Sequence, residues 1–183
     1  MFEDARSVKF QLNGVRTNYF INPSFEDTKS GSLVGWSSFG GSLSSDNTSY
    51  IVGTNSCKLT ASTGTNALIS DWIQLEPSKI YTFSAYVKGP SSSTAYAQIE
   101  FAGPISPLDQ LAILKDGTTN EQYFNTTQPI VTSTPVTINS TSFTRINLVF
   151  QTPEEVSESS LPLIKASIVF PNAVNGSAYN IDC

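Results

Sequence analysis

The sequence predicts an all-β protein, an antiparallel β-sandwich, and three observations lead to this fold class. Apolar and polar residues alternate along most of the apolar segments, which sends successive side chains to opposite faces of a strand. Charged residues make up only 14% of the 183 residues, and the remaining polarity comes from Ser, Thr and Asn, which suit strands and turns. No stretch of helical length keeps a 3.6-residue period.

The clearest strand is Ile80–Lys88, which Gly89 and Pro90 terminate. Its inward face is expected to carry Tyr81, Phe83 and Val87, because these residues alternate with polar ones. The other segments follow the same rule and stop at turn residues. In order, the predicted strands are Thr17–Ile21, Tyr50–Val52, Ser56–Ala61, Ala67–Leu75, Ile80–Lys88, Tyr96–Ala102, Phe143–Gln151, Leu163–Phe170 and Tyr179–Asp182.

The strand phase also predicts which residues form the core. Cys57 lies in phase with Leu59 and is expected to be a free, buried thiol. The other predicted inward residues are Ala61, Ala85, Ala97, Ile99, Phe101, Ile146, Leu148, Phe150, Ile164, Ala166, Ile168 and Phe170.

The chain is organised as an arm and one domain. Residues 1–16 mix charged and apolar residues and are predicted to be an N-terminal arm that reaches a neighbouring subunit. Residues 17–183 form the sandwich, with a long Thr, Asn and Pro-rich insertion at about 104–142. An insertion of this length tends to be functional or mobile.

Composition excludes several classes of function. A net charge of −5 and only 10 Lys and Arg residues give no basic surface for nucleic acid. The first residues do not resemble a signal peptide, and no apolar stretch has the length of a membrane span. The chain has no His, which removes the usual general base at neutral pH. We therefore expect a protein that is not an enzyme.

Several motifs are similar to those of a known family. They are Asn18 to Glu26 (NYFINPSFE), Gly35-Trp36, Gly53 to Thr60 (GTNSCKLT), Tyr81 to Lys88 and the closing Tyr179 to Asp182. In this order they resemble the galactose-binding domain-like jelly rolls, closest to the carbohydrate-binding modules of families 4/9 and 22. The same architecture recurs in tail, fibre and baseplate proteins of tailed bacteriophages. The resemblance covers about residues 17 to 182 and implies that Trp36 is a core aromatic.

The resemblance also implies one structural calcium ion. The matching side chains are Glu26 and Asp182, and main-chain carbonyls near Asn22 and Lys58 would complete the oxygen shell that calcium requires. The alternative is that Glu26 caps turn amides and Asp182 is solvated.

Strand phase suggests a cleft for glycans on a single sheet face. Sugars bind to aromatic rings and to planar polar groups, and the outward residues that offer both are Tyr86, Tyr96, Gln98, Glu100, Arg145 and Asn147. The alternative is an ordinary polar sheet face. Trp72, Tyr50 and Tyr123 are either stacking platforms or packed side chains.

Two functions follow from these expectations. The first is a virion structural or adhesion module of a tailed phage, on a tail, fibre, neck or capsid surface, which binds other virion proteins and contacts host glycans. It would be a homo-oligomer or part of a larger assembly. The alternative is a carbohydrate-binding module of a secreted glycoside hydrolase or another extracellular glycan-binding protein. Neither function involves nucleic acid or a membrane.

Overall fold

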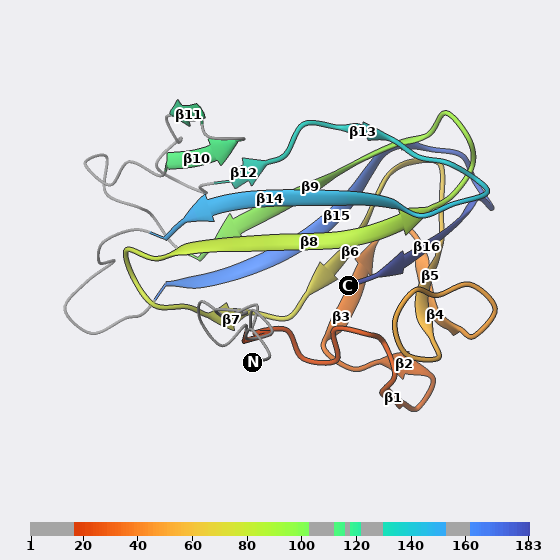
Figure 1. The fold of residues 1–183 in the computed structure, drawn as a ribbon. Coiled ribbons are helices and arrows are strands. Elements are labelled where there is room, and N and C mark those ends of the chain that lie inside the picture. Colours follow the sequence, from red (N-terminus) through yellow and green to blue (C-terminus); the bar gives the residue numbers. More distant parts are fainter. Residues whose placement is uncertain (1–16, 103–111, 116–117, 122–129, 153–161) are drawn as a thin grey trace, which may run out of the picture.

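The structure is a computed structural model that describes residues 17–102, 112–115, 118–121, 130–152 and 162–183. Within these residues two antiparallel sheets form the two layers of a sandwich (Figure 1), so the predicted fold class is confirmed. This part of the chain contains no helix that is long and apolar enough to cross a membrane. The predicted arm at 1–16 and much of the insertion at 104–142 lie outside the described residues.

We call the first layer the β8 sheet. Its strands, in spatial order, are β11 (Thr118–Glu121), β10 (Ala112–Lys115), β14 (Thr144–Gln151), β8 (Ile80–Lys88), β16 (Ala178–Asp182), β5 (Ser56–Thr60) and β4 (Ser42–Asp46). β14 pairs with β8 along nearly its whole length, whereas β16 pairs only with Tyr86, Val87 and Lys88. The first half of β8 therefore has an edge that β16 does not reach.

We call the second layer the β9 sheet. Its strands, in spatial order, are β12 (Ile130–Thr132), β9 (Thr94–Phe101), β15 (Leu163–Ala173), β6 (Gly64–Ser70) and β3 (Trp36–Phe39). β13 (Val136–Thr137) also pairs with β9, and β7 (Ile73–Gln74) pairs with β15. A separate small ribbon joins β1 (Thr28–Lys29) and β2 (Ser32–Leu33). Consecutive strands β8 and β9 thus belong to different layers.

The core lies between the two sheets and follows the predicted phase. Phe83 and Val87 of β8 and Ile99 and Phe101 of β9 all belong to this core, and all four side chains are buried. The other predicted inward residues, apart from the half-buried Tyr81, are buried as well. Cys57 is buried and both cysteines are free, and burial raises the pKa of the Cys57 thiol because a thiolate is poorly solvated there.

The predicted strand Thr17–Ile21 is wrong, because Phe20 packs on the core while the backbone of the segment pairs with no strand among the described residues. The ring of Phe20 stacks on Trp36 with centroids 5.5 Å apart. The Trp36 Nε1–H donates to the Asn22 carbonyl at 3.0 Å. Trp36 is 7% exposed, which confirms that it is a core aromatic. Its contacts with Phe20 and Asn22 hold residues 17–22 against the sandwich.

The predicted strand Tyr50–Val52 is also wrong, and its residues lie in the loop between β4 and β5. The predicted strand Ala67–Leu75 is divided, because Asp71 and Trp72 interrupt it between β6 and β7. The remaining predicted strands are confirmed within a few residues of their ends. The short strands between residues 28 and 46 were not predicted, since Ser and Gly leave little apolar alternation there.

Candidate functional site

The six residues predicted to form one glycan cleft lie on two different sheets. Tyr86 of β8 pairs in register with Arg145 of β14, and Asn147 lies two residues further along β14. Tyr96, Gln98 and Glu100 all lie on β9, in the opposite layer. The prediction of a single cleft is therefore wrong. Alternation shows that a side chain points outward, but it cannot show from which of the two sheets.

The outer surface of the β9 sheet, here called the β9 face, is ordered by the strand register. One row across the sheet joins Glu100 of β9 to Lys165 of β15. The next row joins Gln98, Ser167 of β15 and Ile69 of β6. A third row joins the outward residues Tyr96, Val169, Ala67 and Phe39, which come from β9, β15, β6 and β3. The β9 face therefore has a polar centre and aromatic residues toward its margin.

Aromatic side chains are available at the margin of the β9 face. Phe39 is 60% exposed and Trp72 is 42% exposed, while Tyr96 is half-buried. The Lys165 ammonium lies 4.5 Å from the centroid of the Trp72 ring, a cation–π contact that fixes both side chains. Rings that are held in place and open to solvent can stack on the apolar face of a ligand.

The polar groups at the centre of the β9 face are free to bind a ligand. Among the described residues, no hydrogen bond uses the side chain of Gln98 or Glu100. Glu100 and Lys165 are cross-strand neighbours of opposite charge, so their charges offset each other. An amide, a carboxylate and an ammonium together offer both donors and acceptors, and the small net charge favours a neutral polar ligand.

The outer surface of the β8 sheet, here called the β8 face, includes the exposed side chains of Arg145 and Asn147. The Arg145 guanidinium lies 6.0 Å from the centroid of the Tyr86 ring. On its other side Tyr86 pairs with Asp182, and the loop at 51–52 is bonded to that carboxylate. Tyr86 is the single aromatic among the outward residues of β8 and β14 in the described chain, so this face offers fewer platforms.

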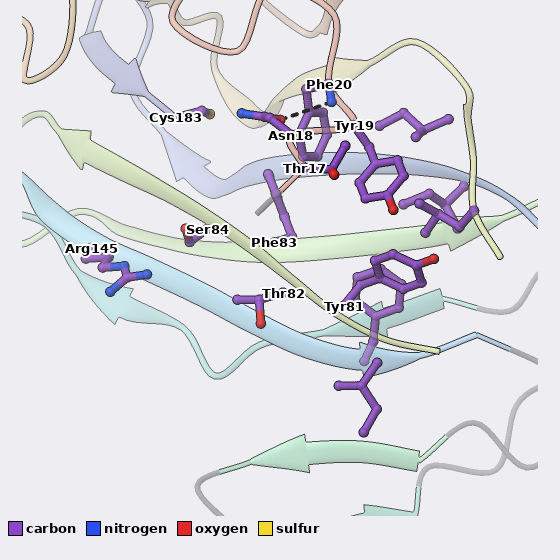
Figure 2. Close-up of a pocket in the computed structure, with 15 residues that line it drawn as sticks. Thr17, Asn18, Tyr19, Phe20, Tyr81, Thr82, Phe83, Ser84, Arg145 and Cys183 are labelled. Carbon is purple, nitrogen blue, oxygen red and sulfur yellow. Dashed lines mark hydrogen bonds between the residues drawn. The ribbon is translucent and has the colours of Figure 1, made fainter. Parts of the chain in front are cut away.

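A cavity of about 710 Å³ opens beside the unpaired edge of β8. Figure 2 shows Thr82, Ser84 and Arg145 along one side of it and the segment Thr17–Phe20 along the other. Its deeper walls are apolar, and Arg145 is the one charged side chain among its lining residues. This cavity is separate from the β9 face, and its lining combines the exposed ring of Tyr19 with the planar polar groups of Asn18 and Arg145.

The two predicted calcium ligands Glu26 and Asp182 hold one loop from two sides. Both Glu26 oxygens are occupied, because they accept hydrogen bonds from the backbone and side chains of Thr54 and Asn55 at 2.6–3.0 Å. These donors lower the pKa of Glu26 from 4.5 to about 2, since they stabilise the charged form. Glu26 thus caps the amides of a turn, as the alternative reading expected.

Asp182 differs from Glu26 in having a free oxygen. Its Oδ2 accepts the backbone N–H groups of Ile51 and Val52 at 2.6 and 2.8 Å. Its Oδ1 is buried and has no hydrogen-bond partner. The prediction that Asp182 is solvated is wrong, because the side chain is fully buried. A buried carboxylate oxygen without a donor is expected to take up a cation or a water molecule.

The two remaining predicted positions make other contacts in the structure, and the calcium ion stays a prediction. The Asn22 carbonyl already accepts hydrogen bonds from Phe25 N–H and Trp36 Nε1. Lys58 lies in the middle of β5 and pairs with β4 on one side and with β16 on the other. Among the described residues, no three His, Cys, Asp or Glu side chains gather into a metal site. Of the four predicted positions, Asp182 is the one with a side-chain oxygen that has no hydrogen-bond partner in the described structure.

The Glu26 carboxylate makes the stability of the folded protein depend on pH. The pKa of Glu26 is depressed in the folded state. Its contribution to the free energy of unfolding is therefore complete above pH 4.5 and is lost as the pH falls toward 2. We expect Glu26→Gln to lower the melting temperature at pH 7 and to flatten the decline between pH 4.5 and 2. Melting curves of both proteins across this range check the expectation. Parallel declines would contradict it, and Glu76→Gln is a control at an exposed position.

An antiparallel sandwich with free polar groups and exposed rings on one sheet face defines a β-sandwich binding module. A model of the CBM_4_9 family, described as a carbohydrate-binding domain, matches residues 17–161. The chain therefore belongs to this family, and its domain is a carbohydrate-binding module. A search of curated proteins finds no match to the chain.

Solved structures share the fold at low sequence identity. The xylan-binding CBM22-2 domain of Paenibacillus barcinonensis Xyn10C has a TM-score of 0.58 and 12% identity, covering 87% of this chain and 93% of that one. TmCBM61 in complex with β-1,4-galactotriose has a TM-score of 0.53 and 15% identity, covering 91% and 95%. Tailspike protein 4 of bacteriophage CBA120 has a TM-score of 0.50 and 14% identity, covering 90% of this chain and 21% of the tailspike. These matches confirm the jelly-roll sandwich.

Proposed function

We propose that this chain binds neutral glycans on its β9 face. The observation that carries the proposal is the set of groups on β9 and β15: the free side chains of Gln98 and Glu100 pair in register with Ser167 and Lys165, and Tyr96 lies next to them along β9. Membership in a carbohydrate-binding family supports the ligand class. Three of the six residues predicted from the sequence, namely Tyr96, Gln98 and Glu100, belong to this site.

The chemistry of each group suits one part of a sugar. The apolar face of a pyranose ring stacks on an aromatic ring such as Tyr96 or Phe39, and its hydroxyls exchange hydrogen bonds with Gln98 and Glu100. Phe39 and Lys165 were not predicted from the sequence. Lys165 lies in the predicted strand Leu163–Phe170 but was given no role, and Phe39 lies in a short strand that alternation did not reveal.

Isothermal titration with xylohexaose and β-1,4-galactotriose tests the proposal. We expect Tyr96→Ala to remove about 1.5–3 kcal/mol of apolar contact, which is at least tenfold in Kd. Glu100→Ala and Gln98→Ala should weaken binding through lost hydrogen bonds. Tyr86→Ala is the matched control, because it removes a tyrosine from the opposite face. Equal losses from Tyr86→Ala and Tyr96→Ala would refute the assignment to the β9 face.

A place on a phage particle is a second proposal, and the tailspike match is the observation that favours it. The module would then serve adhesion, contact host glycans, bind other virion proteins and do no chemistry. Membership in the carbohydrate-binding family fits a secreted glycan-binding protein equally well. Mass spectrometry of purified particles distinguishes the two settings: the chain is recovered with the particle in the first and with the soluble secreted fraction in the second.

We propose that calcium, if the chain holds it, contacts Asp182 Oδ1. This atom is the buried oxygen that lacks a donor, and carboxylate oxygens are preferred calcium ligands. Calcium added to chelator-treated protein should raise the melting temperature, and Asp182→Asn should abolish that increase. Glu26→Gln should leave the increase unchanged, because the Glu26 oxygens already serve Thr54 and Asn55. An unchanged melting temperature in wild-type protein would end the proposal.

A further inference from the structure

A small pocket lies beside Trp72, where the β9 sheet meets the segment 19–21. Its volume is about 170 Å³, room for about six water molecules. The aromatic and apolar part of its lining is Tyr19, Ile21 and Trp72, and the polar part is Asp71 and Gln74. We call it the Trp72 pocket. It is large enough for one sugar ring and has the mixed lining that such a ring requires.

The apolar walls of the Trp72 pocket are exposed. Tyr19 is 43% exposed, Ile21 57% and Trp72 42%. Three large apolar side chains that stay open to solvent around one pocket are more than scattered surface residues, and a group of this kind marks a binding site. Asp71 and Gln74 are also exposed, and among the described residues no hydrogen bond uses either side chain.

The backbone around the Trp72 pocket is fixed before any ligand arrives. The Asp71 N–H donates to the Gly35 carbonyl at 2.9 Å. Gly35 has a φ of 80° and lies so close to Ile21 that a Cβ there would be 2.9 Å from the Ile21 carbonyl oxygen. This position therefore requires glycine. The close approach fixes the segment 19–21 against β3 and Asp71, so the two sides of the pocket keep their spacing.

Trp72 joins the pocket to the β9 face. Its ring is in contact with the Lys165 ammonium at 4.5 Å, and Lys165 pairs with Glu100 in the row that crosses β15 and β9. Ile73 pairs with Ile164, so Trp72 lies directly beside Lys165 along the same row. β15 lies between β9 and β7 in this row. The distance from β9 to β7 is therefore two strand spacings, about 10 Å.

We propose that the Trp72 pocket is a second carbohydrate subsite that takes the terminal sugar ring of a glycan whose body lies on the β9 face. The proposal rests on the proposed function of that face. The sugar ring stacks against the indole of Trp72, and its hydroxyls bond to the Asp71 carboxylate and the Gln74 amide. The pocket then favours oligosaccharides that are long enough to extend from Glu100 past Lys165.

Two indole N–H signals make the test specific. The chain has two tryptophans, and the Trp36 Nε1–H is bonded to the Asn22 carbonyl inside the protein. In ¹H–¹⁵N spectra of the full chain titrated with xylohexaose and β-1,4-galactotriose, the Trp72 indole signal should move with saturation while the Trp36 signal stays. Trp72→Phe assigns the two signals and keeps an aromatic ring.

Affinity measurements on variants complete the test. Trp72→Ala should weaken binding of the longer oligosaccharide about tenfold, and Trp72→Phe should weaken it less. Asp71→Asn and Gln74→Ala should each have a smaller effect of the same sign.

The possible failures are distinguishable. If Tyr96→Ala weakens oligosaccharide binding, Trp72→Ala does not, and the Trp72 indole signal of the wild-type protein does not move, then the subsite is wrong and the proposed function stands. If no glycan binds in calorimetry and neither indole signal moves, both proposals fall. If the Trp72 signal moves and Trp72→Ala weakens binding while Tyr96→Ala does not, the Trp72 pocket stands and the assignment of the β9 face fails.

Discussion

Replacing Phe170 by alanine is expected to destabilise the protein by about 3–5 kcal/mol, the usual cost of removing a buried Phe from a core. Phe170 is 1% exposed. Its ring centroid lies 4.2 Å from that of Tyr179, so the contact joins β15 of one sheet to β16 of the other. Gly89 leaves no room for a side chain against the Tyr179 ring, so the Tyr179 ring is closely packed in this part of the core.

Chemical denaturation measures this loss, and Phe39→Ala is the matched control. Phe39 lies on the same β9 sheet but is 60% exposed, so its replacement should change the free energy of unfolding by no more than about 0.5 kcal/mol. If the two substitutions cost the same, Phe170 does not connect the sheets as the structure describes. The mutant pair also separates stability from binding, since Phe39 belongs to the proposed glycan face.

Replacing Asp182 by alanine, measured with chelator present, is expected to cost about 3 kcal/mol, because hydrogen bonds to a charged group contribute about 1.5–3 kcal/mol each. Asp182 accepts the amides of Ile51 and Val52, which lie about 130 residues earlier in the chain. Without the carboxylate, these amides lose their acceptor, and of the two carboxylates only Glu26 still holds the loop at 50–55.

Hydrogen exchange gives Asp182→Ala a local readout. The amides of Ile51 and Val52 should exchange much faster in the variant, while the amide of Thr54, which donates to Glu26, should change less. Asp71→Ala is a suitable control, because its carboxylate is exposed and holds no loop in the described structure. Unchanged protection at Ile51 and Val52 would show that Asp182 does not hold the loop.

The sequence was a good guide where a strand has one buried face. Ile80–Lys88 alternates fully and is β8 to the residue, because burial of Phe83, Ala85 and Val87 imposes the period. The sequence misled where apolar residues serve something other than a sheet. Phe20 packs on Trp36, and Ile51 and Val52 are exposed in a loop whose amides are bonded to Asp182. Neither contact could be read from neighbouring residues.

The candidate site was predictable in its residue types and unpredictable in its assembly. Tyr96, Gln98 and Glu100 follow from the phase of one strand. Their separation from Tyr86 depends on β8 and β9 lying in different layers, which alternation does not encode. Lys165 joins the site through cross-strand register with Glu100, a contact across about 65 residues that only the folded chain reveals.

Chemical-shift mapping of backbone amides during titration with xylohexaose or β-1,4-galactotriose is the most direct test of the β9 face. Binding there should perturb the amides of β9, β15 and β6 and leave those of β8 and β14 at their original positions. Perturbations that gather on β8 and β14, around Tyr86 and Arg145, would contradict the assignment and would transfer the binding site to the opposite layer.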